Sequence, residues 1–230
     1  MCGLKQRLIQ VQAAIRKAEH ASGRTEGSVR LLAVSKQQPV AAIAELVAAG
    51  HHCFGENYLQ DALPKIQALA ATEVEWHFIG PIQSNKTRSI AEQFAWVHSI
   101  DRLRIAQRLS EQRPADQAPL NICLQVNISD EASKSGVSPD AVAELAHAVA
   151  EFPRLRLRGL MTIPVASRDT AEQRRSFAQL RQLQAQLNHQ GLNLDTLSMG
   201  MSADLEAAIA EGATIVRIGT AIFGPRAPRT

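Results

Sequence analysis

The feature that most constrains the fold of this chain is the regular alternation of short apolar runs with longer amphipathic segments. Amphipathic segments with helical periodicity lie in most of the gaps between the runs. Strands separated by helices pair in parallel, because a parallel connection needs a crossover of a dozen or more residues. The runs with the length of β-strands are residues 31–34, 52–54, 75–79, 95–98, 120–127, 155–161, 195–199 and 214–218.

Eight such units predict an α/β fold, a closed (β/α)8 TIM barrel, with an open doubly wound sheet as the alternative. The chain of 230 residues is long enough for one barrel, so we expect a single domain over residues 1–230. An extra N-terminal helix is predicted at residues 3–21, where Leu4, Leu8, Val11 and Ile15 recur at spacings of three and four.

Charge and cysteine usage exclude several function classes. Lys and Arg number 25 against 22 for Asp and Glu, so the excess is too small to indicate a nucleic-acid surface. Cys2, Cys53 and Cys123 form no zinc motif or disulfide framework, and Cys53 and Cys123 are predicted to be small core residues of strands. No segment has the pattern of a signal peptide or a membrane span. We expect a soluble cytoplasmic protein without a metal, nucleic-acid or membrane partner.

The loops that follow the last two predicted strands carry the features of a phosphate site. TIM barrels place their functional residues at the C-terminal ends of the strands, and they often bind phosphate after strands seven and eight. Ser202 is expected to open a helix, where free backbone amides favour an anion, and the backbone of Gly219 and Thr220 can approach a ligand closely. Taken singly, Ser202 is an ordinary helix cap and Gly219 a tight turn; together they predict a phosphate site.

Two cationic residues also end predicted strands. Lys36 follows the first strand and would project into the mouth of the barrel, where its unprotonated amine can form an imine with an aldehyde. The alternative is a solvated lysine. Arg217 lies among apolar neighbours at the end of the last strand. Its buried guanidinium needs a partner, which is either an acid such as Glu56 or Asp204 or an acceptor on a ligand.

Five further residues are weaker candidates. Asn57 follows the second strand, where it can donate to a phenolate oxygen or cap the next helix. His77 lies inside a predicted strand and is interpreted as a structural, hydrogen-bonded histidine rather than a proton shuttle. Lys86, Asn127 and Lys134 are assigned to the rim of the barrel.

Several segments match one known family, in the order in which that family has them. The strongest are Leu-Ser-Met-Gly-Met-Ser-Ala-Asp at residues 197–204 and Val-Arg-Ile-Gly-Thr-Ala-Ile-Phe-Gly at residues 216–224. The others are residues 33–36, 55–58, 76–80, 83–86, 125–128, 133–136 and 159–161. Together they span about residues 30–226, and through them the chain resembles the pyridoxal phosphate homeostasis protein family.

The resemblance implies a barrel like the N-terminal domain of alanine racemase, with pyridoxal 5′-phosphate (PLP) as the cofactor. It implies that Lys36 carries the cofactor as a Schiff base. It also implies that Ser202, Gly219 and Thr220 hold the phosphate, that Arg217 faces the pyridine nitrogen and that Asn57 lies near the ring. Only the resemblance identifies the phosphate compound as PLP.

The function implied is intracellular homeostasis of this vitamin B6 cofactor by storage, delivery or sensing, without catalytic residues and with apo forms of PLP-dependent enzymes as possible partners. The alternatives are an amino-acid racemase and, more weakly, a sugar-phosphate isomerase or aldolase. A racemase needs a second base, but Tyr58 is the only tyrosine, and Val40 stands where alanine racemases usually carry one. We expect a monomer, because the chain has no room for the β-domain that builds the racemase dimer.

Overall fold

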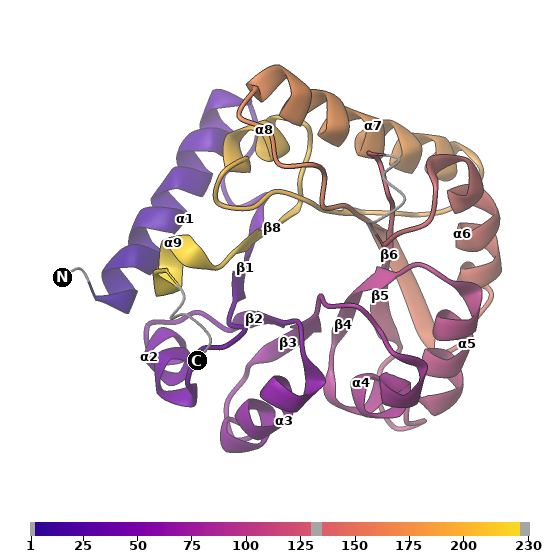
Figure 1. The fold of residues 1–230 in the computed structure, drawn as a ribbon, viewed down its shortest axis with the longest axis horizontal. Helices are drawn as coiled ribbons and strands as arrows, with labels where there is room; N and C mark the ends of the chain where they lie inside the picture. The colour runs from indigo at the N-terminus through magenta and orange to yellow at the C-terminus, as the bar shows by residue number, and fades with distance from the viewer. Residues whose placement is uncertain (1–2, 130–134, 226–230) are drawn as a thin grey trace.

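A computed structural model describes residues 3–129 and 135–225, and in it the strands form one closed barrel (Figure 1). Eight parallel strands pair in chain order, and β8 pairs with β1 to close the ring. The prediction of a TIM barrel is therefore confirmed, and the open-sheet alternative is wrong. The strands are β1 (Arg30–Val34), β2 (Cys53–Glu56), β3 (Glu75–Phe78), β4 (Trp96–Ile100), β5 (Leu120–Gln125), β6 (Leu155–Met161), β7 (Thr196–Ser198) and β8 (Ile215–Ile218).

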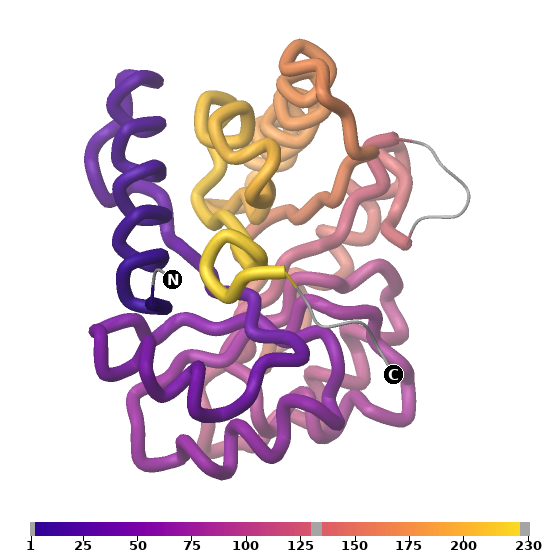
Figure 2. The backbone as a smooth tube through the Cα atoms, turned by 60° about the vertical axis from the view of Figure 1, so that its left-hand side comes forward, coloured from indigo at the N-terminus to yellow at the C-terminus, as the bar shows by residue number. Residues whose placement is uncertain are grey.

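Helices surround this barrel, and the predicted N-terminal helix is present as α1 (Leu4–Ala21). Figure 2 shows α1 running beside the C-terminal part of the chain, and it packs against α2, α8 and α9. No helix in the described part of the chain is long and apolar enough to cross a membrane. The others are α2 (Val40–Ala48), α3 (Leu59–Ala68), α4 (Thr87–Gln93), α5 (Leu103–Gln112), α6 (Val142–Ala150), α7 (Thr170–His189), α8 (Leu205–Ala210) and α9 (Thr220–Phe223), with 3-10 turns η1 (Ser84–Lys86) and η2 (Pro139–Ala141).

The fifth strand ends earlier than its apolar run predicts. The predicted strand 120–127 pairs as β5 only as far as Gln125, and Val126 makes an isolated bridge to Val137. Asn127 N then donates to Val137 O instead of to a neighbouring strand, because the segment that leads into η2 runs along this edge. The difference leaves Asn127 in a loop next to the barrel mouth.

Apolar side chains form two separate clusters on the two faces of the sheet. The larger cluster fills the layer between strands and helices, and the smaller one fills the barrel interior. Cys53 and Cys123 are buried in the interior cluster with free thiols, which confirms their predicted core position. Because successive strand residues face opposite sides, Leu32 and Val34 point inward, and Lys36 continues the same face beyond the end of β1.

Candidate functional site

A cavity of about 250 Å³ opens at the C-terminal ends of the strands. The residues singled out from the sequence as cofactor ligands all line it, although they come from separate loops. The lining residues are Val34, Lys36, Asn57, Ile79, Ile163, Met201, Ser202, Ala203, Arg217, Gly219 and Thr220.

Lys36 is held in a tight turn directly after β1. Gln38 N donates to Ser35 O at 3.0 Å, which closes the turn around Lys36 and Gln37. Gln37 has φ +63°, and it is the non-glycine residue with positive φ in the described part of the chain. A left-handed conformation costs a residue of this type about 1–3 kcal/mol, and such strain is typical of ligand sites. The turn places Lys36 half-buried at the cavity.

A buried ion pair ties the Lys36 turn to the neighbouring loop. Lys65 Nζ of α3 lies 2.8 Å from Glu56 Oε1 and donates to Ser35 O at 2.9 Å. The Ser35 hydroxyl donates to the same Glu56 oxygen at 2.6 Å. Burial raises the pKa of Glu56, and the bonds from Lys65 and Ser35 oppose this rise. Since Ser35 precedes Lys36 and Glu56 precedes Asn57, the pair fixes the backbone that carries both candidate ligands.

Asn57 is positioned by a close backbone contact with Gly80. A Cβ at Gly80 would lie 2.0 Å from Asn57 O, so no other residue fits there without a shift of the backbone. The Oδ1 atom of Asn57 is buried and has no hydrogen-bond partner among the described residues. A buried acceptor without a partner is costly, and a ligand donor in the cavity would satisfy it.

The loop after β7 differs from its prediction. Ser202 does not open α8, which begins at Leu205 with Asp204 as its N-cap, so Ser202 lies in the preceding turn. The Asp204 carboxylate accepts from Met201 N at 2.5 Å and shapes that turn. Gly200 starts the loop with φ +93°, and a Cβ there would lie 2.5 Å from Ala208 Cβ. The exposed hydroxyl of Ser202 is therefore free of a helix-capping role and remains on the cavity wall.

The loop after β8 brings backbone amides to the same wall. Gly219 is the N-cap of α9 and Thr220 is its first residue, where amides lack intrahelical acceptors. A Cβ at Gly219 would lie 3.3 Å from Val34 O, so this loop runs tightly against β1. Arg217 N donates to Gly200 O at 2.9 Å and joins the two loops.

Arg217 is buried at the base of the cavity without a carboxylate partner among the described ion pairs. Its Nη1 donates to Ser198 O at 2.6 Å and to Ser198 Oγ at 2.8 Å, and its Nη2 donates to Thr162 O at 2.8 Å. Burial lowers the pKa of Arg217 to about 10, against the charge of Asp204, so the guanidinium stays protonated at neutral pH. No ion pair among the described residues joins Arg217 to Glu56 or Asp204: Glu56 pairs with Lys65, and Asp204 acts on Arg217 only through its charge.

Of the candidates assigned to the rim, neither Lys86 nor Asn127 lines this cavity. Lys86 and Tyr58 line a neighbouring cavity of about 240 Å³, which shares Asn57 with the first. Asn127 lines neither of these two cavities. Lys134 lies outside the described residues, so its predicted place on the rim stays a prediction.

Sequence reasoning missed the apolar walls of the cavity. They consist of Val34, Ile79, Ile163, Met201 and Ala203. Ile163 comes soon after β6, where the rule of strand C-terminal ends selects it, and Met201 and Ala203 flank Ser202. The position of these residues at strand ends was readable from the sequence, but an apolar side chain carries no chemical signature of a ligand contact.

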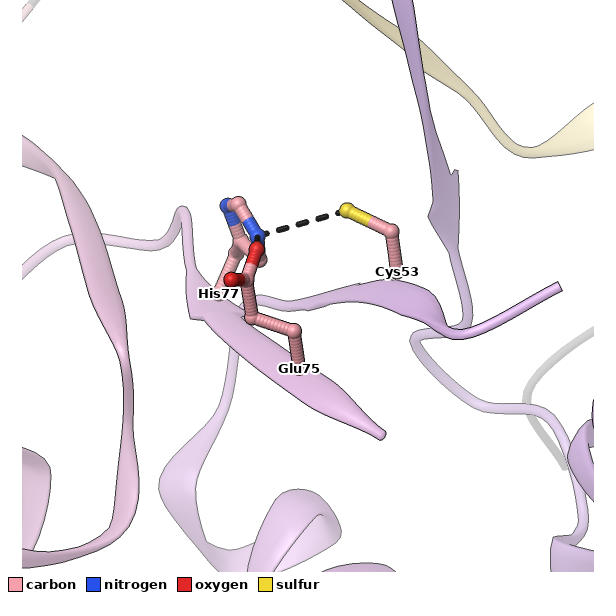
Figure 3. Close-up of side chains that lie close together, drawn as sticks. All are labelled: Cys53, Glu75 and His77. Carbon is pink, nitrogen blue, oxygen red and sulfur yellow. Dashed lines mark hydrogen bonds and ion pairs between the residues drawn. The ribbon is translucent and has the colours of Figure 1, made fainter. Parts of the chain in front are cut away.

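Inside the barrel, below this cavity, His77 lies in a polar cluster with Cys53 and Glu75 (Figure 3). His77 Nε2 is 2.7 Å from Glu75 Oε1 and 3.3 Å from Cys53 Sγ. Its Nδ1 lies 2.9 Å from His98 Nε2. The interpretation of His77 as a buried, hydrogen-bonded histidine is confirmed. The Cys53, Glu75 and His77 ligand atoms lie within 4.8 Å of one another, close enough for a metal ion, a grouping that the sequence spacing did not indicate.

Comparison with known proteins agrees with this geometry. The family model of the alanine racemase N-terminal domain matches residues 9–227. A pyridoxal phosphate homeostasis protein from Pseudomonas aeruginosa is 61% identical over 226 residues, which are 98% of this chain and 97% of the relative. The protein of the same name from Escherichia coli K12 is 54% identical over 222 residues, with 95% of each chain covered.

Solved structures support the same assignment. PipY from Synechococcus elongatus PCC7942, solved with PLP bound, superimposes with a TM-score of 0.81 at 38% identity, covering 91% of this chain and 100% of PipY. Alanine racemase from Corynebacterium glutamicum shares the fold, with a TM-score of 0.71 at 17% identity over 93% of this chain and 60% of the racemase. The chain thus belongs to the family of pyridoxal phosphate homeostasis proteins, within the larger group that shares the alanine racemase N-terminal domain.

Proposed function

We propose that this protein binds PLP in the 250 Å³ cavity, holds it as a Schiff base on Lys36, and acts in PLP homeostasis by storing, delivering or sensing the cofactor. The observation that carries the proposal is the convergence of Lys36, Asn57, Ser202, Arg217 and the Gly219–Thr220 backbone on one cavity. The relatives named as pyridoxal phosphate homeostasis proteins, and the PLP-bound PipY structure, support the choice of ligand.

The cavity offers a complementary group for each part of PLP. Lys36 supplies an amine for the aldehyde, and the Ser202 hydroxyl with the Gly219 and Thr220 amides supplies donors for the phosphate. Arg217 supplies a donor for the pyridine nitrogen. The Asn57 Oδ1 atom has no hydrogen-bond partner among the described residues, which leaves this amide available to a ligand in the cavity. The apolar walls complete a slot suited to an aromatic ring.

The electrostatics disfavour aminotransferase-type chemistry, which relies on the ring as an electron acceptor. Bound PLP supplies an aldehyde that condenses with amines and a ring that can accept electrons. Arg217 keeps its proton at neutral pH, because burial lowers its pKa only to about 10. A permanently protonated donor facing the ring nitrogen disfavours protonation of that nitrogen, and this weakens the ring as an electron acceptor.

The racemase alternative receives no support from the position of Tyr58. A second base must face the substrate carbon opposite Lys36. Tyr58 is 47% exposed and lines the neighbouring cavity rather than the one that holds Lys36. The position of Tyr58 therefore favours a carrier. We further propose that the protein is a monomeric, single-domain cytoplasmic protein and that its partners include apo forms of PLP-dependent enzymes.

Borohydride trapping tests the proposal. The purified protein is incubated with PLP, reduced and digested, and the labelled peptide is identified by mass spectrometry. We expect the label on Lys36, and we expect Lys36→Ala to lose both the label and the visible absorption band. Lys86→Ala is the matched control, since Lys86 lies at the neighbouring cavity, and it should keep both. A label confined to Lys86 or Lys134, or no label at all, would overturn the assignment.

A further inference from the structure

A continuous chain of hydrogen bonds runs through the barrel interior from Glu75 to Arg217. Beyond the contact of Glu75 with His77 and of His77 with His98, His98 Nδ1 lies 2.8 Å from Ser198 Oγ. Ser198 Oγ in turn lies 2.8 Å from Arg217 Nη1. His77, His98 and Ser198 are each 0% exposed, so water does not compete for these bonds.

The lower end of this hydrogen-bonded chain fixes its direction, and the upper end is compatible with that direction. At the upper end, a guanidinium can only donate, so Ser198 Oγ accepts from Arg217 and its own proton is free to be donated to His98 Nδ1. At the lower end, an ionised carboxylate can only accept, so His77 Nε2 donates to Glu75. A neutral His77 then accepts at Nδ1 from His98 Nε2, which leaves His98 Nδ1 as an acceptor. With neutral rings, the lower end therefore requires protonation of His77 and His98 at Nε2, and the upper end is compatible with it.

The charge states agree with this direction. Burial lowers the pKa of His77, against its bond with Glu75, and it lowers the pKa of His98 well below the usual value. Burial by itself raises the pKa of Glu75. The bond with His77 and the charge of Arg30 outweigh this effect and lower the pKa overall. Arg30 Nη1 lies 2.8 Å from Glu75 Oε1. Glu75 is thus a carboxylate at neutral pH, as the direction of the chain requires.

At its upper end the chain of hydrogen bonds determines how the Arg217 guanidinium is oriented. The Ser198 hydroxyl proton points to His98, so its oxygen presents lone pairs to the guanidinium. Three of the five N–H groups of Arg217 bond to Ser198 and Thr162, and no described residue accepts from Nε or from the second N–H of Nη2. Arg217 lines the cavity, so these donors are available to a ligand there.

We propose that His77, His98 and Ser198 are positioning residues, whose directed hydrogen bonds from Glu75 orient Arg217 toward the ring nitrogen of the bound cofactor. This inference rests on the proposed binding of PLP. It extends the cofactor site to the interior of the barrel, and it assigns a role to buried polar residues that do not touch the cavity.

A metal ion at Cys53, Glu75 and His77 is the competing interpretation of the lower end. A cavity of about 580 Å³ at the N-terminal end of the barrel is lined by Arg30, Cys53 and Glu75 and gives access to it. Coordination would need the lone pair of His77 Nε2, the same nitrogen that donates to Glu75 in the directed chain. Arg30 already places a cation on Glu75, and burial raises the pKa of the Cys53 thiol to about 12. The directed chain gives His77 and Glu75 hydrogen-bond partners without a metal, and the Cys53 thiol keeps its proton at neutral pH.

The tautomers test the direction in the unaltered protein. Long-range proton–nitrogen NMR spectra of the wild-type apoprotein should show His77 and His98 as neutral rings protonated at Nε2, between pH 6.5 and 8. Protonation of either ring at Nδ1 would overturn the direction. The same spectra with added Zn²⁺ address the competing interpretation, because coordination by His77 would move its proton to Nδ1. Unchanged spectra support the hydrogen-bonded chain.

A matched pair of amide variants tests the effect on the cofactor. In His98→Asn the amide oxygen takes the place of Nδ1 and keeps the acceptor for Ser198, whereas His98→Gln keeps only the donor toward His77. The measurement is the ratio of dissociation constants for PLP and for an analogue whose ring nitrogen is replaced by C–H. We expect His98→Gln and Ser198→Ala to reduce the preference of the wild type for PLP by roughly tenfold, the value of about one hydrogen bond, and His98→Asn to retain it.

The outcomes separate this inference from the proposed function. If the wild type binds neither PLP nor the analogue, the proposed function fails. If the wild type prefers PLP and His98→Gln and Ser198→Ala keep that preference within about twofold, the positioning role is wrong while PLP binding stands. If His98→Gln or Ser198→Ala does not fold, as judged by circular dichroism, the tautomers of His77 and His98 in the wild type decide whether the positioning role stands.

Discussion

Removing the amine of Lys65 should destabilise the fold more than the loss of an ordinary lysine. The Glu56 side chain is 0% exposed and that of Lys65 is 7% exposed, so the ion pair is almost fully withdrawn from water. Lys65→Met keeps the aliphatic bulk but deletes the bonds to Glu56 and Ser35, and it leaves a buried carboxylate without a counter-ion. Breaking a buried pair in this way costs about 3–5 kcal/mol of the free energy of unfolding.

Urea unfolding at pH 7, followed by circular dichroism, measures this cost. Typical domains have about 5–15 kcal/mol of stability, so Lys65→Met should still fold. The double variant Lys65→Met/Glu56→Gln serves as the matched control, because a neutral amide needs no counter-ion. It should recover at least about 2 kcal/mol relative to Lys65→Met.

The pH dependence of the same variant provides a second test. Burial raises the pKa of Glu56, and loss of Lys65 removes a charge that opposes the rise. A carboxyl whose pKa is higher in the folded state stabilises that state at low pH and loses this contribution as pH rises through the folded value. The cost of Lys65→Met should therefore shrink from pH 7 to pH 5. A cost below about 1 kcal/mol at pH 7, together with additive single variants, would refute the reasoning.

Three further predictions address the site. Ser202→Ala should weaken PLP binding by about ten- to a hundredfold, the value of one hydrogen bond to a charged group, and should leave the affinity for pyridoxal unchanged in absorbance titrations; an equal loss for both ligands would contradict a phosphate contact. The PLP-loaded protein should exchange amino-acid α-protons in deuterated water at no more than trace rates by NMR, while restoring activity to an apo-aminotransferase; rapid exchange abolished by Lys36→Ala would instead indicate a racemase. Stability should fall from pH 7 to pH 5, because unfolded histidine binds protons near its usual pKa whereas burial lowers the pKa of His77 and His98. One imidazole that stays neutral in the folded state contributes up to about 2 kcal/mol over this range. Glu56 acts in the opposite sense, so the contribution of His98 is measured as the difference between the wild type and His98→Asn in urea unfolding. Equal pH profiles of the free energy of unfolding for the two proteins would contradict the buried neutral state.

Much of the candidate site could be predicted from the sequence, because its residues lie at or directly after the ends of predicted strands. Lys36 comes after the apolar run at residues 31–34, and Arg217 ends the run at residues 214–218. Closure of eight parallel strands brings all C-terminal ends to one rim, so the rule of strand ends selects residues that meet in space. The predicted helix start at Ser202 failed, because the Asp204 side chain folds the chain into a turn before α8 begins.

The sequence by itself determined the eight strands, their alternation with helices and the residues that follow the strand ends, because these depend on local patterns along the chain. Only the tertiary structure decided the interior chain that joins His77, His98 and Ser198. His98 and Ser198 lie 100 residues apart, on β4 and β7. Their meeting across the barrel depends on the relative register and stagger of non-adjacent strands, which no local pattern encodes. The pairing of Lys65 with Glu56 was hidden for the same reason, since it requires α3 to pack back on β2 so that its lysine reaches a carboxylate beneath it.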